Sequence, residues 1–454
     1  MSQPLQIGVA ETTINPRMGM QIDGNIGAYR PAQFIMSDLY ARAIVFQQGE
    51  RRFLLLVVDL LAVTREWTEA IRACAAADFG FDPDAVAVHA IQNHSSPSLG
   101  QIMLTERLEA TRKYPWIRGS DPAYGPLVLA KIKPLIAEAL AGLQPVRMVF
   151  GSAMEARVSF NRRVAYRDGT SEMGVRKPGA LYREGPSDPE VGVALFTTDS
   201  LQTLACLLHH TCHPVHWNPH NGIQSDWPGA WVAQVRRELL PTAVPLVING
   251  CSGNVHHGDP LNPHREDTPQ SMAAMLTDAV RTALVGPYLT DDAPVLDYRT
   301  VRFGLPYREF PEEIFTDAAR FIAEHPEPLW TDETHTRFEW DWHFAASLLD
   351  VQEELATHAE FEYEIQALRV GDLAILTLPG EPFVEAQLAI KQASPATRTF
   401  VAHMSNRYVG YIPTPEALAR GGYETRACQG SKLAPEALQM ITDRSVALLR
   451  ELWA

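Results

Sequence analysis

Residues 85–100 read AVAVHAIQNHSSPSLG, an apolar run that passes directly into amides, an imidazole, hydroxyls, proline and glycine. A short run of small and β-branched apolar residues is typical of a buried β-strand, and the proline and glycine after it are typical of a loop. The stretch predicts a strand whose carboxyl end delivers Gln92 and His94 to a polar loop. Because successive strand side chains alternate between faces, Gln92 and His94 are expected to share one face and His89 to point to the other.

The same pattern recurs along the chain and alternates with helical patterns. Apolar, β-branched runs occupy residues 42–48, 53–61, 85–90, 146–153, 191–198, 203–210, 244–250 and 364–380. Helical periodicity occurs at residues 65–80, 124–143, 227–240, 271–286, 311–325, 341–358, 381–394 and 435–452. This alternation predicts an α/β fold with a large mixed β-sheet core flanked by helices.

One block interrupts the alternation of strands and helices. Residues 306–358 are acidic, aromatic and helical in pattern, whereas strand patterns resume after them. The motifs that follow need partners from before the block. We therefore interpret the chain, 1–454, as a single domain with a helical insertion or lid at about 306–358.

The overall composition excludes several classes of partner. The chain has 39 basic and 54 acidic residues, a net charge of −15, which repels nucleic acids and anionic membrane surfaces. No apolar window is long enough to cross a membrane, and the first residues resemble no signal peptide. Five scattered cysteines without a CxxC pair predict reduced thiols. We expect a cytoplasmic protein that acts on a small molecule, with no nucleic acid and no membrane insertion; the oligomeric state stays open.

Histidines are concentrated in one part of the sequence. Eight of the 15 fall between residues 209 and 264, in HHTCHPVHWNPH at the end of one predicted strand and in CSGNVHHGDP after the next. A third strand pattern, LAILTLPG, ends directly on Glu381, and a fourth, TRTFVAHM, leads to Tyr408. Because ligands bind at the carboxyl ends of strands in open α/β sheets, we expect these four strand ends to share one site.

The residue types at these strand ends favour a metal. Imidazole titrates near neutral pH and binds divalent metals well. Nitrogen and oxygen donors without clustered thiolates favour a catalytic Zn²⁺, or another divalent first-row metal, over a closed structural site. Such a metal lowers the pKa of a bound water and polarises a carbonyl group.

Motifs in order along the chain resemble the catalytic domain of the neutral/alkaline non-lysosomal ceramidase family. The family's His-Thr-His-Ser-Gly-Pro loop is similar to AIQNHSSP, its His-Pro metal segment to TCHPVHW, and its metal-binding Pro-Gly-Glu to LTLPGEPFVE. FNRRVAYRDG, INGCSGNVHHGDP and SNRYVGYIPTPEALARGGYE match further family segments in the same order. The resemblance implies a neutral-ceramidase-like catalytic domain, in a divergent cytoplasmic-type member that lacks the family's C-terminal immunoglobulin-like domain.

The resemblance implies a metal site with one altered ligand. Carried over residue by residue, it makes His213, Glu381 and Tyr408 metal ligands. The first His of the family's His-Thr-His is here Gln92, and the second, which assists catalysis, is His94. His94 then either keeps the acid–base position or joins the ligands, and Gln92 is a weak oxygen ligand or a substrate contact.

Further residues are implied by the same resemblance or left open by it. Arg162 and Tyr423 resemble residues that hydrogen-bond the scissile carbonyl, a role suited to a developing oxyanion. In INGCSGNVHHGDP, His256 occupies the position of a serine in the matching family segment, and it is a candidate catalytic residue. His216, a candidate substrate contact, or His256 could also complete the ligand set. Separately, Asp226 and Asp59 are candidates to orient imidazoles, or else a helix cap and a loop anchor.

Three functions are compatible with this sequence. The leading hypothesis is a metal-dependent hydrolase that cleaves an amide C–N bond of a soluble substrate, with metal-activated water as nucleophile. A lyase or isomerase could use the same metal and histidines. A catalytically inactive ligand-binding homologue is the third possibility, motivated by Gln92.

Overall fold

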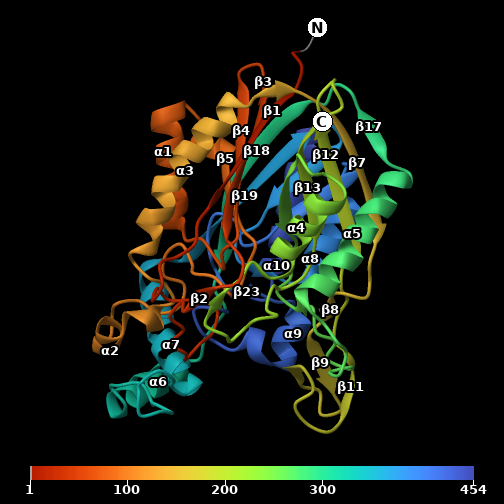
Figure 1. The fold of residues 1–454 in the computed structure, drawn as a ribbon. Helices are drawn as coiled ribbons and strands as arrows, with labels where there is room; N and C mark the ends of the chain where they lie inside the picture. The colour runs from red at the N-terminus through yellow and green to blue at the C-terminus, as the bar shows by residue number, and fades with distance from the viewer. Residues whose placement is uncertain (1–2) are drawn as a thin grey trace.

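Three mixed β-sheets carry the fold, and each contains one parallel pair of strands (Figure 1). The structure is a computed structural model that describes residues 3–454. In the order of their pairing, the strands of the first sheet are β5 (Val86–Ala90), β4 (Arg51–Val58), β3 (Tyr40–Gln48), β1 (Gln6–Thr13) and β6 (Gln144–Pro145). Those of the second are β15 (Val244–Asn249), β13 (Thr203–His210), β12 (Glu190–Thr197), β7 (Arg147–Met154) and β17 (Leu289–Asp291). Those of the third are β18 (Leu296–Pro306), β19 (Glu360–Val370), β20 (Leu373–Thr377) and β22 (Arg398–Ala402).

The parallel pairs are β4 with β5, β13 with β15, and β20 with β22, and the other neighbours in these sheets are antiparallel. Short strands form the remaining pairings: β2 (Phe34–Ile35) with β14 (Gly222–Ile223), β8 (Phe160–Asn161) with β16 (Val255–His256), β21 (Glu381–Pro382) with β23 (Tyr411–Ile412), and β9 (Arg163–Tyr166) with β10 (Ser171–Met173) and β11 (Ala180–Arg183). The α/β class with mixed sheets is confirmed, with the strands divided among three main sheets.

The inner faces of the three sheets share one apolar core. In β13, Ala205 and Leu207 belong to this core, whereas Cys206 and Leu208 face the opposite side. β4 alternates in the same way, with Leu55 in the common core. Alternation of side chains along a strand therefore buries both faces of each sheet.

Helices cover the outer face of each sheet. The helices are α1 (Arg65–Phe79), α2 (Glu109–Lys113), α3 (Tyr124–Ala141), α4 (Asp226–Glu238), α5 (Pro269–Val285), α6 (Glu312–Glu324), α7 (Trp340–Thr357), α8 (Val384–Ala393), α9 (Pro415–Arg420) and α10 (Ala437–Trp453). Helices α1 and α3 pack on the first sheet, α4 and α5 on the second, and α8 and α10 on the third. Each sheet thus has its own apolar interface with helices in addition to the common core.

A buried imidazole joins the main chains of all three sheets. His89, in β5, accepts a hydrogen bond at Nε2 from the backbone N–H of Asn249 at the end of β15 (3.1 Å). Its Nδ1 donates to the backbone oxygen of His403, directly after β22 (2.7 Å). Both ring nitrogens are satisfied only in the neutral form, because the N–H of Asn249 requires an unprotonated Nε2, whereas the carbonyl oxygen of His403 requires a proton on Nδ1.

The 306–358 block contains two helices, α6 and α7, where its pattern predicted them, joined by an irregular segment. Helices α6 and α7 pack against each other and against the segment 104–117, outside the three sheets. That the block is a lid, and that the chain forms a single domain, stay predictions. Among residues 3–454, no helix is both long and apolar enough to cross a membrane.

We predict that acidification destabilises the fold. Burial lowers the pKa of His89, His210 and His343 to about 4 each. The unfolded chain, with histidine pKa values near 6.5, then binds more protons than the native state below that pH. Each histidine therefore lowers the free energy of unfolding by up to about 1.4 kcal/mol per pH unit as the pH falls from about 6.5 to about 4. Urea denaturation at pH 7.5, 6.5, 5.5 and 4.5 measures this slope.

The variant His89→Asn should show a shallower slope than the wild type, by about one bound proton. His358, which is exposed, provides the control, since His358→Asn should leave the slope unchanged. Equal slopes for His89→Asn and the wild type would contradict the prediction.

Candidate active site

The carboxyl ends of the parallel pairs meet at one pocket. β5 leads to Gln92 and His94, β20 leads to Glu381, and β22 leads to Tyr408. All four side chains line a cavity with a volume of about 80 Å³. His213 follows β13, and its Nε2 lies 3.3 Å from Oε2 of Glu381. Strand ends from all three sheets thus bring these residues together.

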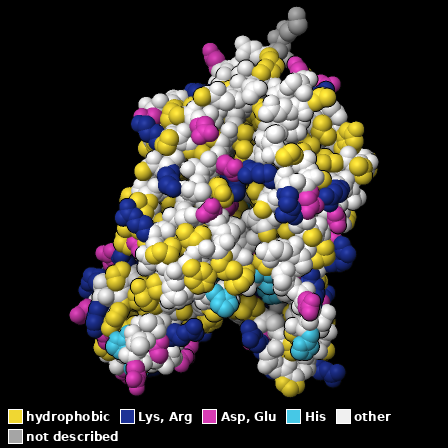
Figure 2. Space-filling view, viewed as in Figure 1, with side chains coloured by type: hydrophobic (Ala, Val, Ile, Leu, Met, Phe, Trp, Pro, Cys, Tyr) yellow, Lys and Arg dark blue, Asp and Glu magenta, His cyan; other side chains and the backbone are white. Residues whose placement is uncertain are grey.

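The surface is hollowed on one side of the molecule. Figure 2 shows the hollow between the part that carries α6 and α7 and the part that carries β9 and β11, with histidine side chains at its edge. Helix α7 supplies His343, Phe344 and Ser347 to the pocket wall.

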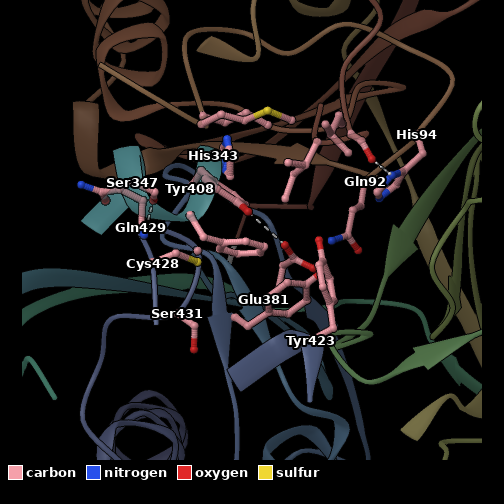
Figure 3. Close-up of a pocket in the computed structure, with 18 of the residues that line it drawn as sticks. Gln92, His94, His343, Ser347, Glu381, Tyr408, Tyr423, Cys428, Gln429 and Ser431 are labelled. Atoms are coloured by element: carbon pink, nitrogen blue, oxygen red, sulfur yellow. Dashed lines mark hydrogen bonds between the residues drawn. The ribbon is translucent and has the colours of Figure 1, made fainter. Parts of the chain in front are cut away.

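His94 and His213 are held in the same way by the main chain. Nδ1 of His213 donates to the backbone oxygen of Ser252 (2.6 Å), and Nδ1 of His94 donates to that of Gly24 (2.9 Å; Figure 3). In the neutral form of each ring, Nε2 therefore keeps its lone pair. Both Nε2 atoms are buried without a hydrogen-bond partner, and the ring centroids are 5.4 Å apart. Metal-ligating histidines are typically held through their other ring nitrogen in this manner.

Glu381, the first residue of β21, adds a buried carboxylate shortly before α8 begins. The hydroxyl of Tyr408 donates to Oε1 (3.2 Å; Figure 3), while Oε2 faces His213 and has no hydrogen-bond donor. Burial raises the pKa of Glu381, and the nearby charge of Arg162 opposes this. Burial also raises the pKa of Tyr408 well above its ordinary value.

These donor atoms fit a divalent metal. An unprotonated imidazole nitrogen that faces a carboxylate oxygen opposes lone pairs, which costs free energy in a buried site unless a cation lies between them. His94, His213, Glu381 and Tyr408 offer nitrogen and oxygen donors without a thiolate. Zn²⁺ and similar first-row metals prefer this set.

The backbone conformation of Gln92 differs from the strand conformation that the sequence predicted. β5 ends at Ala90, and Gln92 has a φ of 67°, so the expected alternation of faces does not extend to it. Its Oε1 accepts a hydrogen bond from the Ser252 hydroxyl (3.2 Å). Its amide also acts to lower the pKa of Glu381. The carbonyl oxygen of Gln92 is thus already engaged by Ser252.

Tyrosines and apolar side chains form the rest of the pocket. Tyr411 and Tyr423 line it with ring centroids 5.7 Å apart. Burial raises the pKa of both hydroxyls, and the charge of Glu381 adds to the effect. Both phenols therefore stay protonated and can donate hydrogen bonds. The apolar lining consists of Ile26, Leu61, Ile102, Met103, Phe344 and Met404.

Arg162 lies behind the pocket lining. Its Nε donates to Glu424 (2.7 Å), and its guanidinium carbon lies 5.5 Å from the ring centroid of Tyr411. Its Nη2 is buried without a hydrogen-bond partner. The buried ion pair positions Arg162 next to Tyr411, and a direct contact between Arg162 and substrate stays a prediction.

His256 and His216 do not line this pocket. His256 pairs with His213 through the main chain, and its Nδ1 is buried without a partner. His216 hydrogen-bonds Asp226 through Nδ1 (2.7 Å), as expected for a carboxylate that orients an imidazole. Asp59 instead pairs with Arg42 (2.8 Å), so it anchors a strand rather than a histidine.

Sequence reasoning missed Ser252 and Gly24. Ser252 fixes His213 through its carbonyl oxygen and Gln92 through its hydroxyl. Gly24 has a φ of +84°, and a Cβ there would lie 2.5 Å from Nδ1 of His94. Both act largely through the backbone, for which a single sequence carries no signal beyond a turn-forming residue.

Comparison with known proteins identifies the fold. No family model matches the sequence, and no curated protein matches it significantly. Among solved structures, neutral ceramidase from Pseudomonas aeruginosa aligns with a TM-score of 0.71 at 18% identity, over 99% of this chain and 75% of that one. A ceramidase complexed with C2 aligns with the same TM-score and identity, over 99% and 76%. The chain has the neutral ceramidase fold. At this low identity the agreement concerns the fold alone.

Replacing Gly24 by alanine should disturb the site more than the backbone conformation alone explains. Gly19 is the matched control, with a φ of +89° and no atom within 4 Å of the position that a Cβ would take. A positive φ costs an alanine about 1–3 kcal/mol at either position. Gly24→Ala should lose more stability than Gly19→Ala in urea denaturation, because only Gly24→Ala displaces His94. Equal losses, with His94 unmoved in a crystal structure, would contradict this.

Proposed function

We propose that the protein is a metal-dependent hydrolase that cleaves an amide C–N bond. The observation that carries the proposal is a buried group of three side chains whose Nε2, Nε2 and Oε2 atoms have no hydrogen-bond partner: His94, His213 and Glu381. His94 and Glu381 line the pocket, and Nε2 of His213 lies 3.3 Å from Oε2 of Glu381. The neutral ceramidase fold supports the choice of an amide bond, since the neighbours are ceramidases. Zn²⁺ or another divalent first-row metal is the proposed cofactor.

His94, His213, Glu381 and Tyr408 are the proposed ligands, and the metal would supply water activation and carbonyl polarisation. Burial lowers the pKa of His94 to about 3 and that of His213 well below its ordinary value. Both rings stay neutral at physiological pH, which suits a ligand and makes His94 a weak base. We therefore assign His94 to the ligand set rather than to proton transfer.

The protein's own residues would position and polarise the substrate. Tyr423 stays protonated beside Glu381, so it can donate to the oxygen that gains charge when the carbonyl is attacked. Tyr411, which is backed by Arg162, can hold a second polar atom of the substrate. The apolar wall formed by Ile102, Met103 and other side chains suits an apolar arm of an N-acyl amide.

Glu381→Ala and His213→Ala should each lose one equivalent of bound metal and most hydrolytic activity. Loss of charge stabilisation worth several kcal/mol corresponds to a fall in kcat/KM of at least about 100-fold. Bound metal is measured by elemental mass spectrometry, and activity by mass spectrometry of products from a panel of N-acyl amides.

The control is His264→Ala, since His264 is exposed in a loop of the histidine-rich region. It should keep both metal and activity. Unchanged turnover in Glu381→Ala would overturn the proposal. A product of the same mass as its substrate would instead indicate an isomerase. A wild-type protein that binds no metal and hydrolyses no amide would indicate a ligand-binding protein.

Tyr423→Phe should reduce kcat by about 10²–10³-fold, the usual cost of removing one oxyanion donor. The bound metal should be unchanged, because the Tyr423 hydroxyl is not among the proposed ligands. Tyr411→Phe is the comparison, and we expect a rise in KM with a smaller change in kcat. Loss of metal in Tyr423→Phe would show that this hydroxyl has another role.

A further inference from the structure

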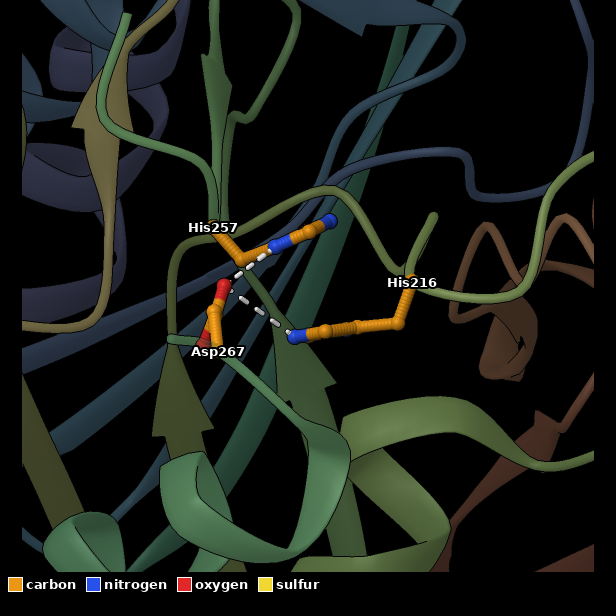
Figure 4. A group of neighbouring side chains, drawn as sticks. All are labelled: His216, His257 and Asp267. Atoms are coloured by element: carbon orange, nitrogen blue, oxygen red, sulfur yellow. Dashed lines mark hydrogen bonds and ion pairs between the residues drawn. The ribbon is translucent and has the colours of Figure 1, made fainter. Parts of the chain in front are cut away.

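A second group of metal-binding side chains lies away from the pocket. His216 follows β13, His257 follows β16, and Asp267 precedes α5; one potential ligand atom of each lies within 4.8 Å of the others (Figure 4). The rings of His216 and His257 are stacked with centroids 3.5 Å apart. Nδ1 of His257 and Nε2 of His216 both face Oδ2 of Asp267. None of the three lines the active-site pocket.

A fourth residue fixes the orientation of His216. Asp226 accepts from Nδ1 of His216 (2.7 Å) and from its backbone N–H (2.9 Å). Nε2 of His216 is therefore directed at Asp267, yet it has no hydrogen-bond partner although only 3% of the side chain is exposed. Oδ1 of Asp267 is also buried without a partner. A carboxylate that holds the far nitrogen of an imidazole is the usual support of a metal-ligating histidine.

The spacing suits a small tetrahedral cation. Nε2 of His216 lies 3.4 Å from Oδ2 of Asp267. Ligands bound at about 2.0–2.1 Å in tetrahedral geometry stand about 3.4 Å apart. Two imidazoles and one carboxylate favour Zn²⁺ over Ca²⁺ or Mg²⁺, which prefer oxygen. A bound cation would replace the hydrogen bond between His257 and Asp267. The second carboxylate oxygen of Asp267, Oδ1, has no hydrogen-bond partner and can rotate towards the cation.

We propose that His216, His257 and Asp267 form a second site for a divalent first-row cation, with Asp226 as its positioning residue. The site joins the loop after β13 to the loop between β16 and α5. His256 precedes His257 and pairs with His213, so an occupied second site would hold the backbone that carries His213. This inference does not rest on the proposed hydrolase function.

The net charge around these side chains favours a bound cation. The carboxylates of Asp226 and Asp267 face ring nitrogens of His216 and His257. Arg265 is the one guanidinium paired with Asp267 among residues 3–454, at 3.5 Å. When both carboxyls are ionised and both histidines are neutral, the group carries one uncompensated negative charge. A proton on His216 is the alternative to a metal, and the experiment separates the two.

The experiment counts zinc equivalents in matched variants after equilibrium dialysis. The wild type should bind two equivalents, Glu381→Ala one, His257→Gln one, and the double variant none. His264→Gln, in the same loop and exposed, is the control and should bind two. Adding Zn²⁺ should raise the Tm of Glu381→Ala but not that of the double variant, and circular dichroism verifies that each variant is folded.

The possible outcomes distinguish the two proposals. One equivalent in the wild type that His257→Gln removes and Glu381→Ala retains would support the second site and refute the first. Equal zinc contents in His257→Gln, Asp267→Asn and the wild type would overturn the second site in favour of a protonated His216. Asp226→Asn should weaken zinc binding at this site by about 10–100-fold.

Discussion

The arrangement of the molecule depends on the way three mixed sheets share one core. Each sheet buries both faces, one against the common core and one against its own helices. The position of each sheet relative to the other two must therefore be fixed. The neutral imidazole of His89 contributes to this by bonding the main chains of Asn249 and His403, beside the second and third sheets. As a result the carboxyl ends of three parallel pairs come to the same place. That common edge carries His94, His213, Glu381 and Tyr408.

Unpaired polar atoms at this edge connect the fold to chemistry. Buried nitrogen and oxygen atoms normally find partners, because leaving one unsatisfied costs roughly 1–3 kcal/mol. Here Nε2 of His94 and of His213 and Oε2 of Glu381 have none, although their other polar atoms are bonded with good geometry. An environment that fixes one end of each side chain and leaves the other end free is organised to bind a cation. The group around Asp267 repeats this arrangement, with Asp226 in the supporting position.

The sequence anticipated much of the architecture, for a physical reason. Apolar periodicity reports burial, and a strand buried on both faces, such as β13, reads as a continuous apolar run. Its observed bounds, Thr203–His210, coincide with the run found in the sequence. Periodicity carries no information on which strands pair, so the division into three sheets was not foreseen. The meeting of strand ends was foreseen, since chemistry at the carboxyl ends of parallel strands is general.

By itself the sequence determined the α/β class, the strand ends that carry histidine, glutamate and tyrosine, and the resemblance that connects them to a metal. Only the tertiary structure decided how these residues are used. It placed Gln92 in a left-handed conformation against Ser252, and it grouped His216 with His257 and Asp267, away from the pocket. The reason is that ligand geometry depends on contacts between residues far apart in the chain, through main-chain groups that are the same in every residue.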